Sequence, residues 1–535
     1  MRAAIQAIAN KQPHWIFFLA LSAFYLSFTP GTIIGMGYNL ENFTAADQVT
    51  TNLINLVLRH PLAPMSWPRH GPLELLFELP FVFASRFLFG DSLGRIGQIM
   101  TLQPILFTSL SCLVTFLWIQ RLTNNLAWTY SLSLTAGVAT MLWPYTNIGL
   151  ETTQSLFVIL AAYLALAAEK RPSLLRLVIF GFACGAAISV KLNGIFLIPA
   201  IIYLVYCYFF CGHKSLADTL RLDAPKMTLV ITIVACTYFA NRYCSSRFWA
   251  GYGGSSSFFF TLLADNPARM AFQFLSYFGS VNKSLLLYAP ITALSLFTLP
   301  KAYRNHPCIV IFAVLILAGM AGGPSLTYTW ADETWGPRYL HESILPLTIC
   351  FASSKASLSL IDSEFQWRRE TPLLAAAVLG FVISSLGSLF YYGHLHAAVT
   401  SASQNTFESL QFDPRLNHIE FNARLLRVYA RKRFGGTDNP EYWPTSYHWW
   451  FQKPSDAPQE KTVDLRELAR PLPLLVKEWD SSLPISLNQH RALRLLLFCT
   501  FLFSLAMFVY LAHLFTRNSR TRAFAKSERL PQNRS

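Results

Sequence analysis

The chain has 535 residues, of which 53% are hydrophobic and only 13% are charged. This charged fraction is about half that of an average soluble protein. The formal charge is +15 at pH 7, and the mean hydropathy is +0.36. Apolar runs of roughly 17 to 24 residues recur along most of the chain, and each is long enough to cross the hydrocarbon layer of a bilayer. The composition therefore excludes an assembly of ordinary soluble domains and indicates a polytopic membrane protein.

Twelve apolar runs are predicted to span the membrane. The first, 14–34, follows a short basic start without a persuasive cleavage site, so we interpret it as a retained signal anchor. The others are 97–119, 127–146, 152–168, 174–190, 193–210, 227–243, 284–300, 308–329, 338–353, 372–392 and 491–515. The expected fold is therefore an all-α polytopic membrane protein with about 12 transmembrane helices.

The positive charge lies mainly in connectors between these runs. Five basic segments fall on one side of the membrane if the twelve spans are correct: 169–176, 211–226, 301–307, 353–370 and the tail 516–535. Basic connectors of membrane proteins face the cytoplasm, so this charge predicts topology and gives no reason to expect a nucleic-acid partner. The expected partners include membrane lipids.

The segment 71–90 is apolar enough to be a thirteenth span. However, Glu74, Glu78 and Arg86 would be costly in lipid, and a span here would invert every later connector. We therefore expect an interfacial or re-entrant helix within a large first outer loop, 35–96.

The predicted organisation has four parts. Residues 1–392 form the transmembrane core, and 393–490 form a small folded cap or long structured loop on the outer face. The last span, 491–515, is followed by the basic cytoplasmic tail 516–535. The nine cysteines lie almost all in apolar runs and show no CxxC spacing, so neither a disulfide framework nor a zinc site is indicated.

The sequence WADETWGPRYL, 330–340, concentrates polar groups at the predicted outer face. Arg338 has the planar fork that suits a phosphate, whereas Trp335 and Tyr339 are residue types that lie at the lipid headgroups. An aromatic belt with an anchoring arginine is the alternative interpretation. Asp332 and Glu333 are candidate ligands for a divalent cation, but without further carboxylates the sequence assigns no metal.

The first outer loop contains a second group of candidates. Asp47 precedes an amphipathic stretch, and Arg69 and His70 follow later in the loop. A carboxylate in front of a helix can be an N-cap, or it can be a general base at the membrane surface.

Taken in order, several segments resemble the GT-C class of integral-membrane glycosyltransferases. The resemblance is to the branch that uses lipid-phosphate sugars, which includes protein O-mannosyltransferases and aminoarabinose transferases. The matching elements are Asp47, HGPLELLFELP (70–80), GLETTQSLFVILAAYLAL (149–166), GAAISVKLNGIFLIPA (185–200), GSVNKSLLLYAPI (279–291) and WGPRYLHESILP (335–346). Asp47 follows two alanines, whereas this class often has a pair of acids in its first loop.

The resemblance implies transfer of a sugar from a polyprenyl-phosphate carrier to a lipid, glycan or protein acceptor, with inversion. The active site would face the periplasm or exterior, at a bacterial inner membrane. Asp47 would be the catalytic base, and the residues that bind phosphate or donor would be Arg338, Lys191, Arg69, His70 and Lys283. Glu151, Asp332, Glu333, Tyr339 and Trp335 would support them, and no cofactor beyond a candidate divalent cation is implied.

Two other functions stay open. One is a transporter or flippase of a lipid-linked or anionic solute, which would place charges near mid-span. The other is a catalytically silent assembly partner of the same fold. Individual residues also have structural interpretations: Glu151 suits the first turn of a helix, and Lys191 can extend its ammonium to the membrane surface.

Overall fold

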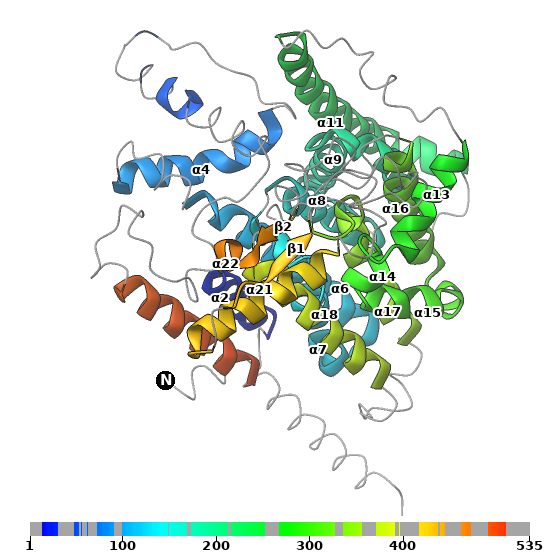
Figure 1. The fold of residues 1–535 in the computed structure, drawn as a ribbon. Coiled ribbons are helices and arrows are strands. Elements are labelled where there is room, and N and C mark those ends of the chain that lie inside the picture. The colour runs from blue at the N-terminus through cyan, green and yellow to red at the C-terminus, as the bar shows by residue number, and fades with distance from the viewer. Residues whose placement is uncertain are drawn as a thin grey trace, which may run out of the picture.

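The computed structural model describes residues 13–29, 48–52, 55, 61, 72–89, 99–147, 149–167, 173–211, 216–251, 267–326, 335–355, 371–390, 395, 417–436, 439–444, 462–471 and 491–509. In these ranges the regular structure is helical apart from one short antiparallel strand pair (Figure 1). The expectation of an all-α membrane protein is therefore confirmed.

The N-terminal part of the bundle contains α2 (Pro13–Ser27), α4 (Pro72–Phe89), α6 (Leu102–Thr123) and α7 (Leu126–Val138). Two asparagines join α6 to α7. Asn124 has a left-handed backbone with φ 46°, which asparagine tolerates better than most residues, and it ends α6. The Asn125 carboxamide then accepts hydrogen bonds from the first amides of α7. The result is a tight helical hairpin.

The predicted span 127–146 is wrong as a continuous helix. α7 ends at Val138, and after a turn the chain forms the short 3₁₀ helix η1 (Pro144–Asn147) before α8 (Gly149–Leu166). Pro144 has no backbone N–H and disfavours a helical conformation at Trp143, so the helix cannot run on continuously through this point. Trp143 and Tyr145 are instead buried in the core of the bundle.

Most of the remaining bundle follows the predicted runs. Its elements are α9 (Leu174–Ser189), η2 (Leu192–Leu197), α10 (Ile198–Phe210), α11 (Leu216–Gly251), α13 (Pro267–Gly279), α14 (Leu285–Tyr288), α15 (Ile291–Asn305), α16 (Pro307–Ser325), η3 (Arg338–Ser343), α17 (Ile344–Lys355) and α18 (Thr371–Leu389). α11 is longer than its predicted run, 227–243, and a further helix covers 491–509.

Six helical stretches in the described residues are long and apolar enough to cross a membrane: Leu102–Thr123, Leu192–Phe210, Asp223–Ser245, Pro307–Ser325, Thr371–Leu389 and Arg491–Val509. The predicted number of about twelve spans is therefore not established. Several of these helices expose large apolar side chains, among them Leu495 and Leu496 of the last helix, as expected for surfaces in contact with lipid.

The described part of 393–490 contains α21 (His418–Arg433), β1 (Tyr442–Pro444), β2 (Thr462–Asp464) and α22 (Leu465–Leu468). These elements share a small hydrophobic cluster that includes Phe421, Trp443 and Leu465. Two side-chain amides attach α21 to the bundle. Asn417 donates to the Val281 carbonyl at 2.7 Å, and Asn422 donates to the Leu386 carbonyl at 3.0 Å.

Several helix ends that adjoin the basic connectors lie together, and we name this region the connector end. The Arg121 guanidinium donates to the Ala167 carbonyl, and the Asn305 amide donates to the Ser353 carbonyl. The Lys355 ammonium lies 4.9 Å from the ring centroid of Trp128. These contacts agree with the predicted up-and-down order of the helices, which places the basic connectors on one side. That this side faces the cytoplasm stays a prediction.

Candidate functional site

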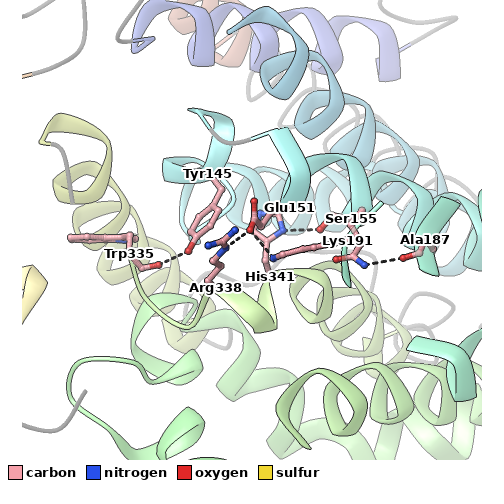
Figure 2. Close-up of polar contacts among 9 residues, drawn as sticks. Tyr145, Glu151, Ser155, Ala187, Lys191, Trp335, Arg338 and His341 are labelled. Carbon is pink, nitrogen blue, oxygen red and sulfur yellow. Dashed lines mark hydrogen bonds and ion pairs between the residues drawn. The ribbon is translucent and has the colours of Figure 1, made fainter. Parts of the chain in front are cut away.

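Three charged side chains that are distant in sequence meet at the N-terminal end of α8, whose C-terminal end belongs to the connector end. Figure 2 shows the three side chains together. Glu151 lies in the first turn of α8, Lys191 between α9 and η2, and Arg338 at the start of η3. Lys191 Nζ lies 2.7 Å from Glu151 Oε1, and Arg338 Nε donates to the same oxygen. We name these three residues the ion cluster. Since Glu151, Lys191 and Arg338 are 0%, 3% and 4% exposed, the cluster is almost completely shielded from water.

Local backbone structure determines where Lys191 lies. α9 ends at Ser189, and Lys191 adopts an extended conformation with φ −133° and ψ 150° before η2 begins. The Asn241 carboxamide of α11 donates to the Ser189 carbonyl at 2.7 Å and accepts from the Leu73 amide of α4 at 2.9 Å. These bonds fix the end of α9, and with it the point from which Lys191 extends.

A glycine determines where Arg338 lies. Gly336 has φ +65°, a left-handed conformation that side chains other than glycine rarely adopt. A Cβ at this position would also lie 2.8 Å from the ring of Tyr288. Because Gly336 allows the chain to turn so close to Tyr288, Arg338 can enter the bundle next to Glu151.

Aromatic and hydroxyl groups surround the ion cluster. The Tyr145 hydroxyl donates to the Trp335 carbonyl at 3.0 Å, and the Tyr145 ring lies 5.1 Å from that of His341. His341 Nδ1 is 2.7 Å from the Ser155 hydroxyl, and the Lys191 ammonium lies 5.0 Å from the centroid of Tyr339. Figure 2 shows Tyr145 of η1, Ser155 of α8 and His341 of η3 converging on the ion cluster. The surroundings therefore hold the charged groups in fixed positions.

The electrostatic arrangement is asymmetric. One carboxylate oxygen of Glu151 faces two cations, and Glu342, 1% exposed, lies within electrostatic range of Lys191. Among the described residues, neither carboxyl oxygen of Glu342 has a hydrogen-bond partner. Two cations shielded from solvent are suited to bind a phosphate or to stabilise negative charge that develops in a reaction. A buried ion cluster can equally be a structural feature.

The structure brings together some of the predicted site residues. Glu151, Lys191, Arg338 and Tyr339 meet in the ion cluster or against it, and Trp335 is bonded beside it through its carbonyl. Lys283 is fully buried in the turn before α14, where its backbone amide donates to the Ser280 hydroxyl. The predicted residues Asp47, Arg69, His70, Asp332 and Glu333 lie outside the described residues.

A second polar group next to the ion cluster was not predicted as a site. Glu74 of α4 accepts hydrogen bonds from Gln103 of α6 at 3.1 Å and from Thr153 of α8 at 3.0 Å. Glu74 is only 1% exposed, so the acid interpreted as too costly for lipid is buried within protein and hydrogen-bonded. That α4 lies at the interface or is re-entrant, and does not cross the membrane, stays a prediction.

His341 and Ser155 were also missed as members of the site. A signal was present in the sequence, because Glu151 and Ser155 are four residues apart and therefore lie on one face of α8. Arg338 and His341 are likewise three residues apart in one short helix.

Neither the protein-family models nor the curated proteins include a match to this chain. Among solved structures, the chain is similar to one described as "Crystal Structure of ArnT from Cupriavidus metallidurans in the apo state". The sequence identity is 15% and the TM-score is 0.46, over 79% of this chain and 69% of that chain. At this level of similarity the comparison assigns neither a family nor an activity.

Proposed function

We propose that the chain is a glycosyltransferase that moves a sugar from a polyprenyl-phosphate carrier to an acceptor at the outer face of the membrane. The observation that carries the proposal is the convergence of Lys191 and Arg338 on one carboxylate oxygen of Glu151, where water is excluded. The sequence segments that resemble GT-C enzymes contribute all three residues.

In this proposal Lys191 and Arg338 bind the phosphate of the donor. An ammonium has three N–H donors, and Glu151 accepts from one of those of Lys191. Glu151 keeps the two cations at a fixed spacing, so little reorganisation is needed when a phosphate arrives. Glu151 is thus a positioning residue.

The reaction requires a base for the acceptor. The acceptor oxygen or nitrogen would attack the anomeric carbon as the bond from that carbon to the phosphate oxygen breaks. The acceptor proton would pass to Asp47, and the negative charge that develops on the departing phosphate would be stabilised by Lys191 and Arg338. A single displacement of this kind inverts the anomeric centre.

The position of the charges favours an enzyme over a transporter. Glu151 is the third residue of α8, Lys191 follows α9, and Arg338 is the first residue of η3. The three residues are therefore at helix ends, whereas a substrate path through the membrane would require charged groups near mid-span. A transporter or a catalytically silent assembly partner would be the conclusion if the assay below gave no turnover.

The test is release or transfer of sugar from a panel of radiolabelled polyprenyl-phosphate sugars by the purified chain in nanodiscs. We expect Lys191→Gln and Arg338→Lys to lower kcat/KM by about 100-fold or more, the effect of removing one charge-stabilising donor in known enzymes. Asp47→Asn should abolish turnover without weakening donor binding, since it removes only the base.

Arg424→Gln is the matched control because Arg424 is an arginine on the surface of α21, paired with Glu420. It should leave turnover unchanged. Size-exclusion elution establishes that each variant is folded. Turnover that survives in the folded Lys191 and Arg338 variants would refute the assigned roles, and no turnover of any donor by the unaltered chain would refute the activity.

A further inference from the structure

Three cysteines converge where α10 meets α16. Cys207 and Cys211 are one turn apart at the C-terminal end of α10, and Cys308 is the second residue of α16. The three Sγ atoms all lie within 4.8 Å of one another. Cys207 is buried, Cys308 partly buried and Cys211 exposed, so the group reaches from the interior to the surface.

The spacing of these sulfur atoms suits a bound metal ion. Three thiolates around one ion, with metal–sulfur bonds of about 2.3 Å, place their sulfur atoms about 4.0 Å apart. Only a small movement separates the observed group from that geometry.

A tyrosine lies beside the group. Tyr203 is four residues before Cys207 on the same face of α10, and its hydroxyl is close to Cys207 and Cys308. A hydroxyl next to ligand atoms is in position to orient metal ligands.

The position in the bundle favours a metal ion over a disulfide. Cys308 follows Asn305, whose amide belongs to the connector end, and the basic connectors there predict the cytoplasmic side. Thiols stay reduced in the cytoplasm, where they are free to bind metal.

We propose that Cys207, Cys211 and Cys308 form a binding site for a single thiophilic metal ion, with Cu(I) favoured over Zn(II). Soft thiolate ligands select these two ions, and structural zinc sites almost always have four protein ligands. Among the described residues, no fourth histidine, cysteine or carboxylate joins the group. The bound ion would crosslink α10 to α16, and this proposal is independent of the proposed glycosyltransferase activity.

The test uses the purified full chain in detergent, reduced and freed of metal. Cu(I) is titrated against a chromophoric Cu(I) chelator, and Zn(II) against a zinc indicator in a separate arm. We expect one Cu(I) per chain, retained by Cys236→Ser and lost by Cys207→Ser and Cys308→Ser. Cys236 is an exposed cysteine of α11, so its variant is a matched control. Equal retention of copper by all four proteins would overturn the site, and retention of zinc alone would overturn the choice of ion.

A second readout does not depend on variants that must fold. A maleimide should alkylate Cys211 of the metal-free chain, because Cys211 is exposed at the end of α10. Addition of one equivalent of Cu(I) should slow this alkylation, as followed by peptide mass spectrometry. An unchanged rate at Cys211 would contradict the proposal.

Discussion

Removing the acid of the ion cluster should destabilise the protein far more than removing either cation. Lys191 Nζ lies 2.7 Å from Glu151 Oε1, and both side chains are almost completely buried. With an effective dielectric constant of about 20, the gross attraction of such a pair is about 6 kcal/mol before the cost of desolvation. Glu151→Gln leaves two buried cations without their shared carboxylate, and loss of a partner from a buried pair costs about 3 to 5 kcal/mol.

Lys191→Met has a different result because Glu151 keeps Arg338 as a partner. The remaining pair, Glu151 and Arg338, is neutral overall. We therefore expect Lys191→Met to lower the free energy of unfolding by less than half as much as Glu151→Gln. The double variant Glu151→Gln/Lys191→Met should be more stable than Glu151→Gln alone, since it removes one of the two buried cations that have lost the Glu151 carboxylate.

The assay is the free energy of unfolding from denaturant titration in mixed micelles, for both single variants and the double variant. The exposed pair Glu420–Arg424 on α21 is the control cycle, with an expected coupling of about 0.3 to 0.5 kcal/mol. The reasoning is refuted if Lys191→Met costs as much as Glu151→Gln, or if the coupling in the ion cluster is no larger than in the control.

Three further predictions concern packing and hydrogen bonds, and the same titration measures each. Gly319→Ala should lower the free energy of unfolding by about 1 to 3 kcal/mol, because its Cβ would lie 2.2 Å from the Phe196 carbonyl oxygen. Gly322→Ala in the same helix should not lower it, because no atom lies within 4 Å of that Cβ. Asn241→Ala should cost about 1 to 3 kcal/mol by leaving buried backbone groups of α4 and α9 unpaired. Tyr145→Phe should cost about 0.5 to 1.5 kcal/mol because it removes the hydrogen bond from the Tyr145 hydroxyl to the Trp335 carbonyl. Equal effects of the two glycine variants, or no effect of the other two, would contradict the structure.

The sequence predicted the helices well because most of them are continuous apolar runs. The predicted run 174–190 corresponds to α9, Leu174–Ser189, and 372–392 corresponds to α18, Thr371–Leu389. The failure at 127–146 has a local cause, since mean hydropathy registers neither the turn after Val138 nor the restart of the helix at Pro144. Apolar composition is equally compatible with a lipid-facing helix and with a buried one.

The candidate site was predictable only in part. Arg338 and Lys191 were chosen for the chemistry of their side chains, and the structure shows that they share Glu151. The hydrogen bonds of Glu74 could not be predicted, because Gln103 and Thr153 come from other helices. The cysteine group escaped prediction for a similar reason, since its third member lies far along the chain from the pair in α10.

α16, which has the sequence PCIVIFAVLILAGMAGGPS, contains no acidic or basic residue, yet it packs against both short helices that adjoin the cations of the ion cluster. A Cβ at Gly323 would lie 2.1 Å from the Phe196 ring, and one at Gly319 would meet the Phe196 backbone, so η2 lies directly against this helix. Lys191 comes immediately before η2, and Arg338 opens η3, which also packs on α16. Small residues in an uncharged helix therefore influence where charges on other elements lie, and a methyl group added there would displace η2 without altering any polar residue.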